Sequence, residues 1–240
     1  MSIFHPASAI CQKCGTKNEV ERNASINVDS RQDLRDEILD GSFQAQPCTN
    51  CATTLRLPPH LSYLDVGRAQ WIMARPADEL ENWEQEETDA RATFERSFGA
   101  GAPPSGQELG KGMQARLVFG WPALREKVLA HDIGLDDVTL EMLKISIMRS
   151  VNKPPIADQT ELRLTAGNAD TLDFTWVVAA TEQRLVGLSV PREVYDDIAA
   201  DPEPWAALRA SFDDKLLVDL RRMVAGKAVA ETVSGWEDPA

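Results

Sequence analysis

The stretches Cys11-Gln12-Lys13-Cys14 and Cys48-Thr49-Asn50-Cys51 together hold all four cysteines of the chain. Two residues between the thiols of each pair let one tight turn point both sulfur atoms at a common ion. Two such turns brought face to face complete a tetrahedral sulfur site of the kind that suits Zn²⁺. Gly15 follows the first pair, where such a turn often needs a positive φ. Four sulfur atoms leave no open coordination position, so the spacing predicts a structural zinc site with ligands Cys11, Cys14, Cys48 and Cys51.

Three other uses of these cysteines compete with zinc. Two disulfides are disfavoured if the chain stays in a reducing compartment. A thioredoxin-like redox centre needs one Cys-x-x-Cys at the start of a helix in a βαβ unit, and neither pair has that context. Iron in a rubredoxin-like site has the same four ligands, so the spacing does not exclude it. Zinc is favoured because it is the commoner occupant of such sites.

The residues around the two pairs predict a zinc ribbon with an inserted helix over residues 1–76. Residues 19–28 alternate between polar and apolar, as in a strand. A short helix is expected over residues 29–41, with Asp29 and Ser30 as candidate N-caps and Gly41 as its end. Further strands are expected at residues 53–57 and 71–76. His60 lies close in sequence to the second pair, and we expect it at the surface or beside the ligands rather than on the metal.

This order of features resembles the CpXC family of bacterial and archaeal proteins. The resemblance rests on Cys-x-x-Cys-Gly at 11–15, Ser-Ile-Asn-Val at 25–28, Ile-Leu-Asp-Gly at 38–41 and the second Cys-x-x-Cys, and it continues through residues 117–120, 124–129 and 134–137. It covers roughly residues 8–150. Gln12 and Thr49 stand where the family usually has proline, which is not a ligand. The resemblance implies the four ligand positions, and the family brings no established biochemical activity with it.

A helical segment is expected over residues 77–153, packed on the ribbon. Leu80, Trp83, Ala90, Phe94 and Phe98 form one apolar stripe. Residues 99–106 read as a flexible break, a second helix is expected to start at Pro122, and a third to follow Asp136.

A separate α+β domain is expected over residues 154–226, after a boundary at Lys153-Pro154-Pro155. Alternation before and after the Gly167-Asn168 turn predicts a hairpin, and residues 185–190 predict a third strand. Helices are expected over residues 191–200 and along a stripe from Trp205 to Met223. The whole chain is therefore predicted to be α+β, with the C-terminal domain a small antiparallel sheet covered by helices that folds on its own. Residues 227–240 are expected to be a flexible tail.

The charge of the chain is unevenly distributed. The formal net charge is −13, yet residues 1–76 hold eight basic and eight acidic side chains and are neutral. An acidic body is repelled by phosphate backbones and anionic lipids, so nucleic-acid binding is disfavoured and membrane insertion is not expected. The N-terminus has no basic stretch followed by an apolar one, so we expect a cytoplasmic protein.

No familiar catalytic motif occurs in the sequence. Gly106 to Gly112 resembles a phosphate-binding loop but is one residue short and lacks the Ser or Thr after Lys111. The leading hypothesis is a zinc-binding interaction or accessory protein whose partner is another protein. An enzyme with a dispersed active site and a nucleic-acid-binding regulator that uses the ribbon are the alternatives. The oligomeric state is left open.

Overall fold

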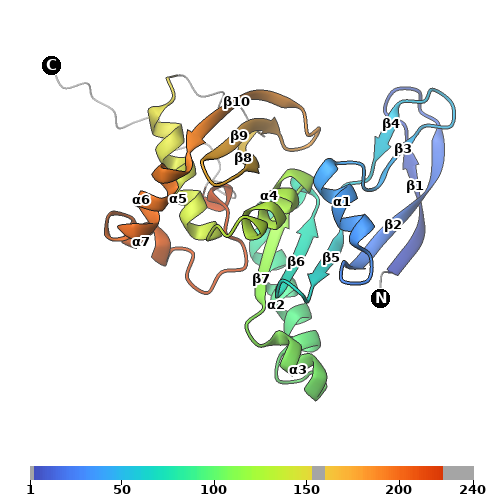
Figure 1. Ribbon diagram of the computed structural model, residues 1–240. Coiled ribbons are helices and arrows are strands. Elements are labelled where there is room, and N and C mark those ends of the chain that lie inside the picture. Colours follow the sequence, from blue (N-terminus) through green and yellow to red (C-terminus); the bar gives the residue numbers. More distant parts are fainter. Residues whose placement is uncertain (1–2, 153–159, 224–240) are drawn as a thin grey trace.

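A computed structural model describes residues 3–152 and 160–223 and shows an α+β fold with three sheets (Figure 1). The largest sheet has five strands in the order β1-β2-β5-β6-β7. Its strands are β1 (Ile3–Ile10), β2 (Lys17–Asn27), β5 (Leu61–Asp65), β6 (Gln70–Arg75) and β7 (Gln114–Phe119). A two-stranded sheet, β3 (Ala45–Pro47) with β4 (Thr54–Arg56), is inserted between β2 and β5 together with helix α1 (Gln32–Asp40).

Helices cover both faces of the five-stranded sheet. Strand alternation sends Ile72 and Ala74 of β6 to one face, where they pack with α1 and α4 (Trp121–Asp132). Trp71 and Met73 point to the other face and pack against α2 (Trp83–Phe98). The short helices η1 (Ala77–Asn82) and α3 (Pro104–Gly110) flank α2 in the sequence.

The segment over residues 77–153 is not wholly helical as predicted, because it contains β7. This strand pairs with β6 in parallel, and α2 and α3 form the crossover between the two strands. Leu117, Val118 and Phe119 are all buried, so β7 has the unbroken apolar run of a strand that is covered on both faces. The expected helices after Pro122 and Asp136 are confirmed as α4 and α5 (Asp137–Ser150).

Two further predictions for the N-terminal half are wrong in detail. Asp29 and Ser30 do not cap α1, which begins at Gln32 after Arg31. The Asp29 carboxylate instead accepts the backbone N–H groups of Val66 and Gly67, which ties the end of β2 to the β5–β6 turn. Residues 71–76 form a strand as expected, but it lies in the five-stranded sheet and not in a ribbon.

The C-terminal residues form the predicted antiparallel sheet, with strand order β10-β9-β8. Its elements are β8 (Thr160–Gly167), β9 (Thr171–Val178) and β10 (Arg184–Pro191), followed by α6 (Arg192–Ala200). The single helix expected from Trp205 to Met223 is wrong. The chain forms only η2 (Glu203–Trp205), α7 (Ala206–Ala210) and η3 (Leu220–Met223), and Leu216 and Leu217 join the core beneath α2.

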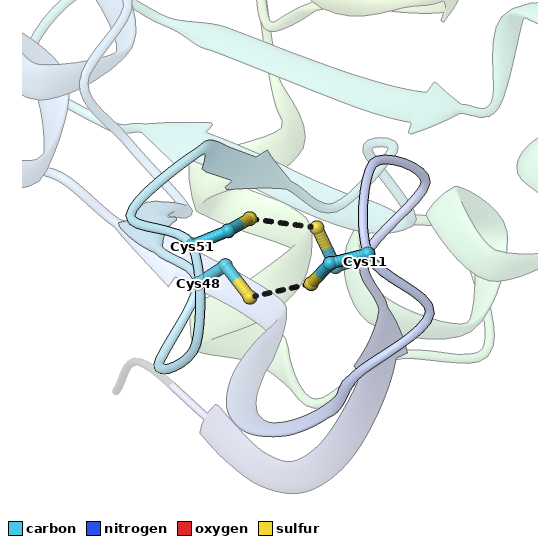
Figure 2. A group of neighbouring side chains, drawn as sticks. Cys11, Cys48 and Cys51 are labelled. Carbon is cyan, nitrogen blue, oxygen red and sulfur yellow. Dashed lines mark hydrogen bonds between the residues drawn. The ribbon is translucent and has the colours of Figure 1, made fainter.

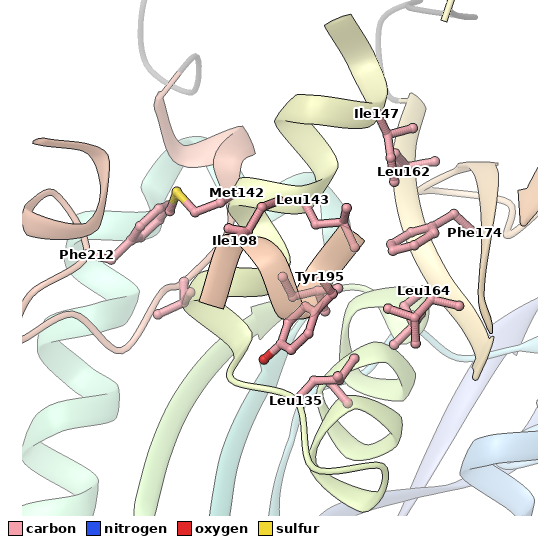
Figure 3. Close-up of a cluster of buried hydrophobic side chains, with 14 of the residues drawn as sticks. Leu135, Met142, Leu143, Ile147, Leu162, Leu164, Phe174, Tyr195, Ile198 and Phe212 are labelled. Carbon is pink, nitrogen blue, oxygen red and sulfur yellow. The ribbon is translucent and has the colours of Figure 1, made fainter. Parts of the chain in front are cut away.

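One apolar core joins residues from both sides of the expected boundary at residues 153–155, which lies outside the described residues. Leu140, Leu143 and Ile147 of α5 pack with Leu162 and Phe174 of the C-terminal sheet (Figure 3). Tyr195 and Ile198 of α6 complete the cover of this core. The C-terminal strands thus share their core with α5, which speaks against independent folding of residues 154–226.

A network of buried ion pairs crosses the same junction. Glu126 of α4 is fully buried, and its carboxylate accepts Lys144 Nζ at 2.6 Å, Arg163 Nη1 at 2.8 Å and the backbone N–H of Leu164 at 2.7 Å. Arg163 also donates to Glu161 and, at 2.6 Å, to Asp219. We call this the buried charge network; its members are Glu126, Glu141, Lys144, Glu161, Arg163, Asp219 and Arg221. A separate group of ion pairs joins Asp137 to Arg116 and Lys127.

Candidate metal centre

The two Cys-x-x-Cys pairs occupy the turns of two hairpins that face each other. Cys11 and Cys14 lie between β1 and β2, and Cys48 and Cys51 lie between β3 and β4. The Sγ atoms of Cys11 and Cys51 are 3.6 Å apart, as are those of Cys14 and Cys48 (Figure 2). All four Sγ atoms lie within 4.8 Å of one another, and none is in a disulfide. The four cysteines therefore lie close enough to bind one metal ion.

The two turns repeat one backbone design. The N–H of Cys11 donates to the carbonyl of Thr16 at 2.9 Å, and the N–H of Cys48 donates to the carbonyl of Thr53 at 2.8 Å. In each turn the residue after the second cysteine has a positive φ, 73° at Gly15 and 56° at Ala52. The sequence pattern behind this is Cys-x-x-Cys-x-Thr in both places. The glycine was singled out in the sequence, whereas Ala52 and the two threonines were not.

The surroundings of the sulfur atoms lower the pKa of two thiols, those of Cys14 and Cys48, and raise the pKa of a third, that of Cys11. The hydroxyl of Thr16, 3.3 Å from Cys14 Sγ, and its backbone N–H lower the pKa of Cys14 to about 5. Backbone N–H groups of Cys51 and Asn50 lower the pKa of Cys48. The N–H of Cys14 favours the Cys11 thiolate, but burial and two neighbouring sulfurs raise the pKa of Cys11 to about 11. Cys14 is thus a thiolate at neutral pH, which is the form of cysteine that binds metal ions.

A buried asparagine joins the two turns. Asn18 is 1% exposed, and its side-chain oxygen accepts the backbone N–H of Thr49 at 2.8 Å and the Thr49 hydroxyl at 2.9 Å. Its amide nitrogen donates to the carbonyl of Thr16 at 2.9 Å and lies 3.5 Å from Cys48 Sγ. One side chain thereby fixes the distance between the turns and supports a thiolate. The sequence analysis missed Asn18, since a single Asn on a predicted strand carries no pattern.

Among the described residues, the potential metal-ligating side chains that cluster together are those of the four cysteines. His60 is exposed and is not part of this cluster. Asp136 and Asp137, at the start of α5, have different roles. Asp136 caps α5 by accepting the N–H of Thr139, whereas Asp137 is buried in ion pairs with Arg116 and Lys127. That Cys11, Cys14, Cys48 and Cys51 bind a metal ion stays a prediction.

A groove of about 860 Å³ opens beside the metal centre. Its walls come from five separate parts of the chain: the end of β1 with the first turn, β4 with the residues around it, the start of η1, the start of α4, and the β9–β10 turn. Trp121 lies at the groove, and Arg56 stacks on its ring with the guanidinium 5.0 Å from the ring centre. Ile10, at the rim, is 64% exposed. The groove can hold a ligand, since binding sites usually measure about 300–1,000 Å³.

The fold and the site define an α+β protein with four clustered cysteines that are compatible with a metal site. The family model described as CpXC protein matches residues 10–144. This match covers more than half of the chain, so the chain belongs to the CpXC family. Comparison with curated proteins and with solved structures gives no match. The matched region ends inside α5, so the C-terminal sheet lies beyond it.

No helix within residues 3–152 and 160–223 combines the length and the apolar character that crossing a membrane requires.

Proposed function

We propose that the four cysteines bind one structural Zn²⁺ and that the two hairpins around it form a zinc ribbon. A tetrahedral zinc with Zn–S distances of about 2.3 Å places its sulfur ligands about 3.8 Å apart. The 3.6 Å separations of Cys11 from Cys51 and of Cys14 from Cys48 fit that geometry. Four thiolates fill the coordination sphere, which supports a structural and not a catalytic role for the metal.

The small apolar content of this region supports the same role. The buried cluster around the two turns consists of Cys11, Cys48 and Leu55, with Cys51 packed against it. So small a cluster offsets only part of the entropy of ordering two turns. Metal binding at such sites supplies roughly 10–16 kcal/mol at neutral pH, which is enough to offset the rest.

Metal analysis tests the zinc assignment directly. The purified chain should hold about one zinc per molecule, and a Cys48→Ser variant should hold much less. The control is a substitution at the exposed His60, which is not one of the four cysteines. A His60→Ala variant should keep the full zinc content. A red protein with about one equivalent of iron would show that zinc is the wrong metal.

The protein then serves as an interaction or accessory component in the cytoplasm, where thiols stay reduced, and its partner is another protein. The observation that carries this proposal is the closed four-sulfur site next to an open groove of about 860 Å³. The metal orders Ile10 and Lys13 on one wall and Thr53–Leu57 on the other, so it shapes the groove without touching what binds there.

A site-specific photo-crosslinker at Ile10 tests the partner proposal in cells. The same group at Leu109, which is 45% exposed on α3 and does not line the groove, is the matched control. We expect one protein to be captured reproducibly from position 10 and not from position 109. Capture should fall in a chain that also carries Cys48→Ser. Capture of nucleic acid from position 10, or equal capture from both positions, would contradict the proposal.

A further inference from the structure

A second groove, of about 530 Å³, lies between β2 and β3, strands that do not pair with each other. Two glutamine side chains from the β3 segment span the gap instead of a backbone ladder. Gln46 donates to the carbonyl of Glu19 at 3.0 Å, and Gln44 donates to the carbonyl of Glu21 at 3.3 Å. We call this cavity the β2–β3 groove.

Two buried acceptors at the β2–β3 groove have no hydrogen-bond donor. Asn23 is 3% exposed, and its side-chain oxygen is unpartnered, as is the side-chain oxygen of Gln44. Both residues line the groove. Gln44 also has a positive φ of 54°. Residues other than glycine rarely adopt this backbone conformation, and those that do are often found at binding sites. Buried acceptors without a donor cost free energy that a ligand with N–H groups would recover.

The charge at the groove points to a cation. Glu19, Glu21 and Glu37 line it, and no basic side chain does. Among the described residues, no ion pair involves these three carboxylates. The rest of the wall is apolar and would pack against an alkyl stem: Phe4, Val20, Leu34, Phe43, Leu55 and Leu57.

The edge of β2 that faces away from β1 adds donors for a polypeptide backbone, because β5 pairs only with Ser25, Ile26 and Asn27 of β2 and leaves the earlier residues without a second strand among the described residues. The Cys11–Thr16 hydrogen bond sets the ladder between β1 and β2, so alternate residues of β2 turn their backbone groups away from β1. Glu19 and Glu21 are among them, as the bonds from Gln46 and Gln44 to their carbonyls show. Their N–H groups therefore face the β2–β3 groove and can donate to peptide carbonyls.

We propose that the β2–β3 groove binds a lysine side chain of an extended segment of the partner protein. The ammonium carries three N–H donors, which match the oxygens of Asn23 and Gln44 and one carboxylate of the rim. The alkyl stem lies on the apolar wall, and the flanking backbone follows the edge of β2. This inference rests on the proposed function, because it names the chemistry that the protein partner presents.

Peptide titration of the zinc-loaded full chain tests the inference. The probe is acetyl-Ala-Val-Lys-Val-Ala-amide, and the matched control replaces its lysine with norleucine, which keeps the stem and removes the ammonium. In amide NMR spectra we expect saturable shifts at Val20, Asn23 and Gln44 with the lysine peptide and at least tenfold weaker binding of the norleucine peptide. Equal binding of the two peptides, or shifts confined to other surfaces, would overturn the inference.

Variants and a free amine sharpen the result. Asn23→Leu should weaken the lysine peptide at least fivefold and Glu37→Gln about threefold, whereas Glu108→Gln on exposed α3 should change nothing. If the Asn23→Leu variant does not fold, the Glu37→Gln variant still tests the inference. If n-pentylammonium binds as tightly as the lysine peptide, the site is one for free amines and the partner assignment is wrong. Zinc measured on the same sample separates the outcomes, because lost peptide binding at full zinc content overturns only this inference.

Discussion

Asn18 and Thr49 are 31 residues apart in the sequence, yet the side-chain oxygen of Asn18 accepts both the backbone N–H and the hydroxyl of Thr49. Asn18 follows the first cysteine pair and Thr49 lies inside the second, so this contact sets how the two turns face each other. The relationship assigns a positioning role to a residue that is not itself a ligand.

The first prediction concerns this contact. Replacing Asn18 with Leu removes its hydrogen bonds to Thr16, Thr49 and Cys48 but leaves all four thiols in place. We expect zinc affinity to fall 10- to 100-fold, the usual effect of removing a partner that orients metal ligands. Competition with a chromophoric chelator measures it. Asn82→Leu, at an exposed position before α2 that makes no side-chain cap, is the control and should bind zinc normally.

A second prediction concerns the order in which the thiols react. With zinc bound, all four should resist alkylation at neutral pH. After chelation, Cys14 should react first, because it is exposed and its pKa is about 5, and Cys11 last, because it is buried and its pKa is raised. Timed alkylation with mass spectrometry resolves the order. The denatured chain is the control, and there the four should react at similar rates; similar rates in the folded chelated protein would contradict the assignment.

A third prediction uses the two positive-φ residues as a matched pair. Ala52→Gly relieves a left-handed conformation that costs an L-residue about 1 kcal/mol, so it should strengthen the metal-bound fold. Gly15→Ala introduces the same cost, and no atom lies within 4 Å of the added Cβ, so the change is purely conformational. Urea unfolding of the zinc-loaded chains should show midpoint shifts of opposite sign. Shifts of the same sign would mean that the turns are not equivalent.

The clustering of the four cysteines could be largely predicted from the sequence, and the sheets only in part. The Cys-x-x-Cys spacing predicts each turn directly, because both cysteines of a pair and the turn that joins them lie within four residues. The β7 strand could not be predicted, because its parallel partner β6 lies 44 residues earlier in the sequence and its apolar run does not alternate. Leu216 and Leu217 were read as one helix with Trp205, since apolar spacing alone does not show that they enter a different core.

The buried charge network gives the fourth prediction. Arg163→Met removes a cation that serves Glu126, Glu161 and Asp219, and leaves these carboxylates buried without it. We expect a loss of about 3–5 kcal/mol in the free energy of unfolding. Glu108→Gln, which breaks an exposed pair with Lys111, should change it by no more than about 0.5 kcal/mol. Denaturant titration measures both, and a loss below about 1 kcal/mol at position 163 would show that water reaches the network.

The fifth prediction concerns acid. Burial disfavours the charged Asp137 carboxylate, but Lys127 and Arg116 outweigh burial and hold the pKa of Asp137 below its ordinary value of 3.8. The pKa values of Glu126 and Asp219 are lowered for similar reasons, while that of Glu141 is raised. As pH falls below about 4.5, the unfolded chain takes up protons first, so the lowered groups make folding less favourable, and Glu141 opposes them.

Asp137→Asn should therefore flatten the loss of stability between pH 5 and pH 3, even though it lowers stability at pH 7. The denaturant midpoint at each pH measures the slope. Comparing the two chains removes the contribution of thiol protonation, which they share, and Asp213→Asn at an exposed position should keep the original slope. An unchanged slope in Asp137→Asn would place the acid sensitivity elsewhere.

The buried charge network also has a consequence for folding during synthesis, because its members are synthesised at different times. Glu126 and Lys144 leave the ribosome within the family-matched region, but Arg163, Asp219 and Arg221 follow up to 95 residues later. At about 5–20 residues per second, that delay lasts roughly 5–20 s. During this interval Glu126 and Glu141 have Lys144 as their ion-pair partner but Glu126 lacks Arg163, so α4 and α5 complete their buried ion pairs only after the C-terminal residues have been synthesised.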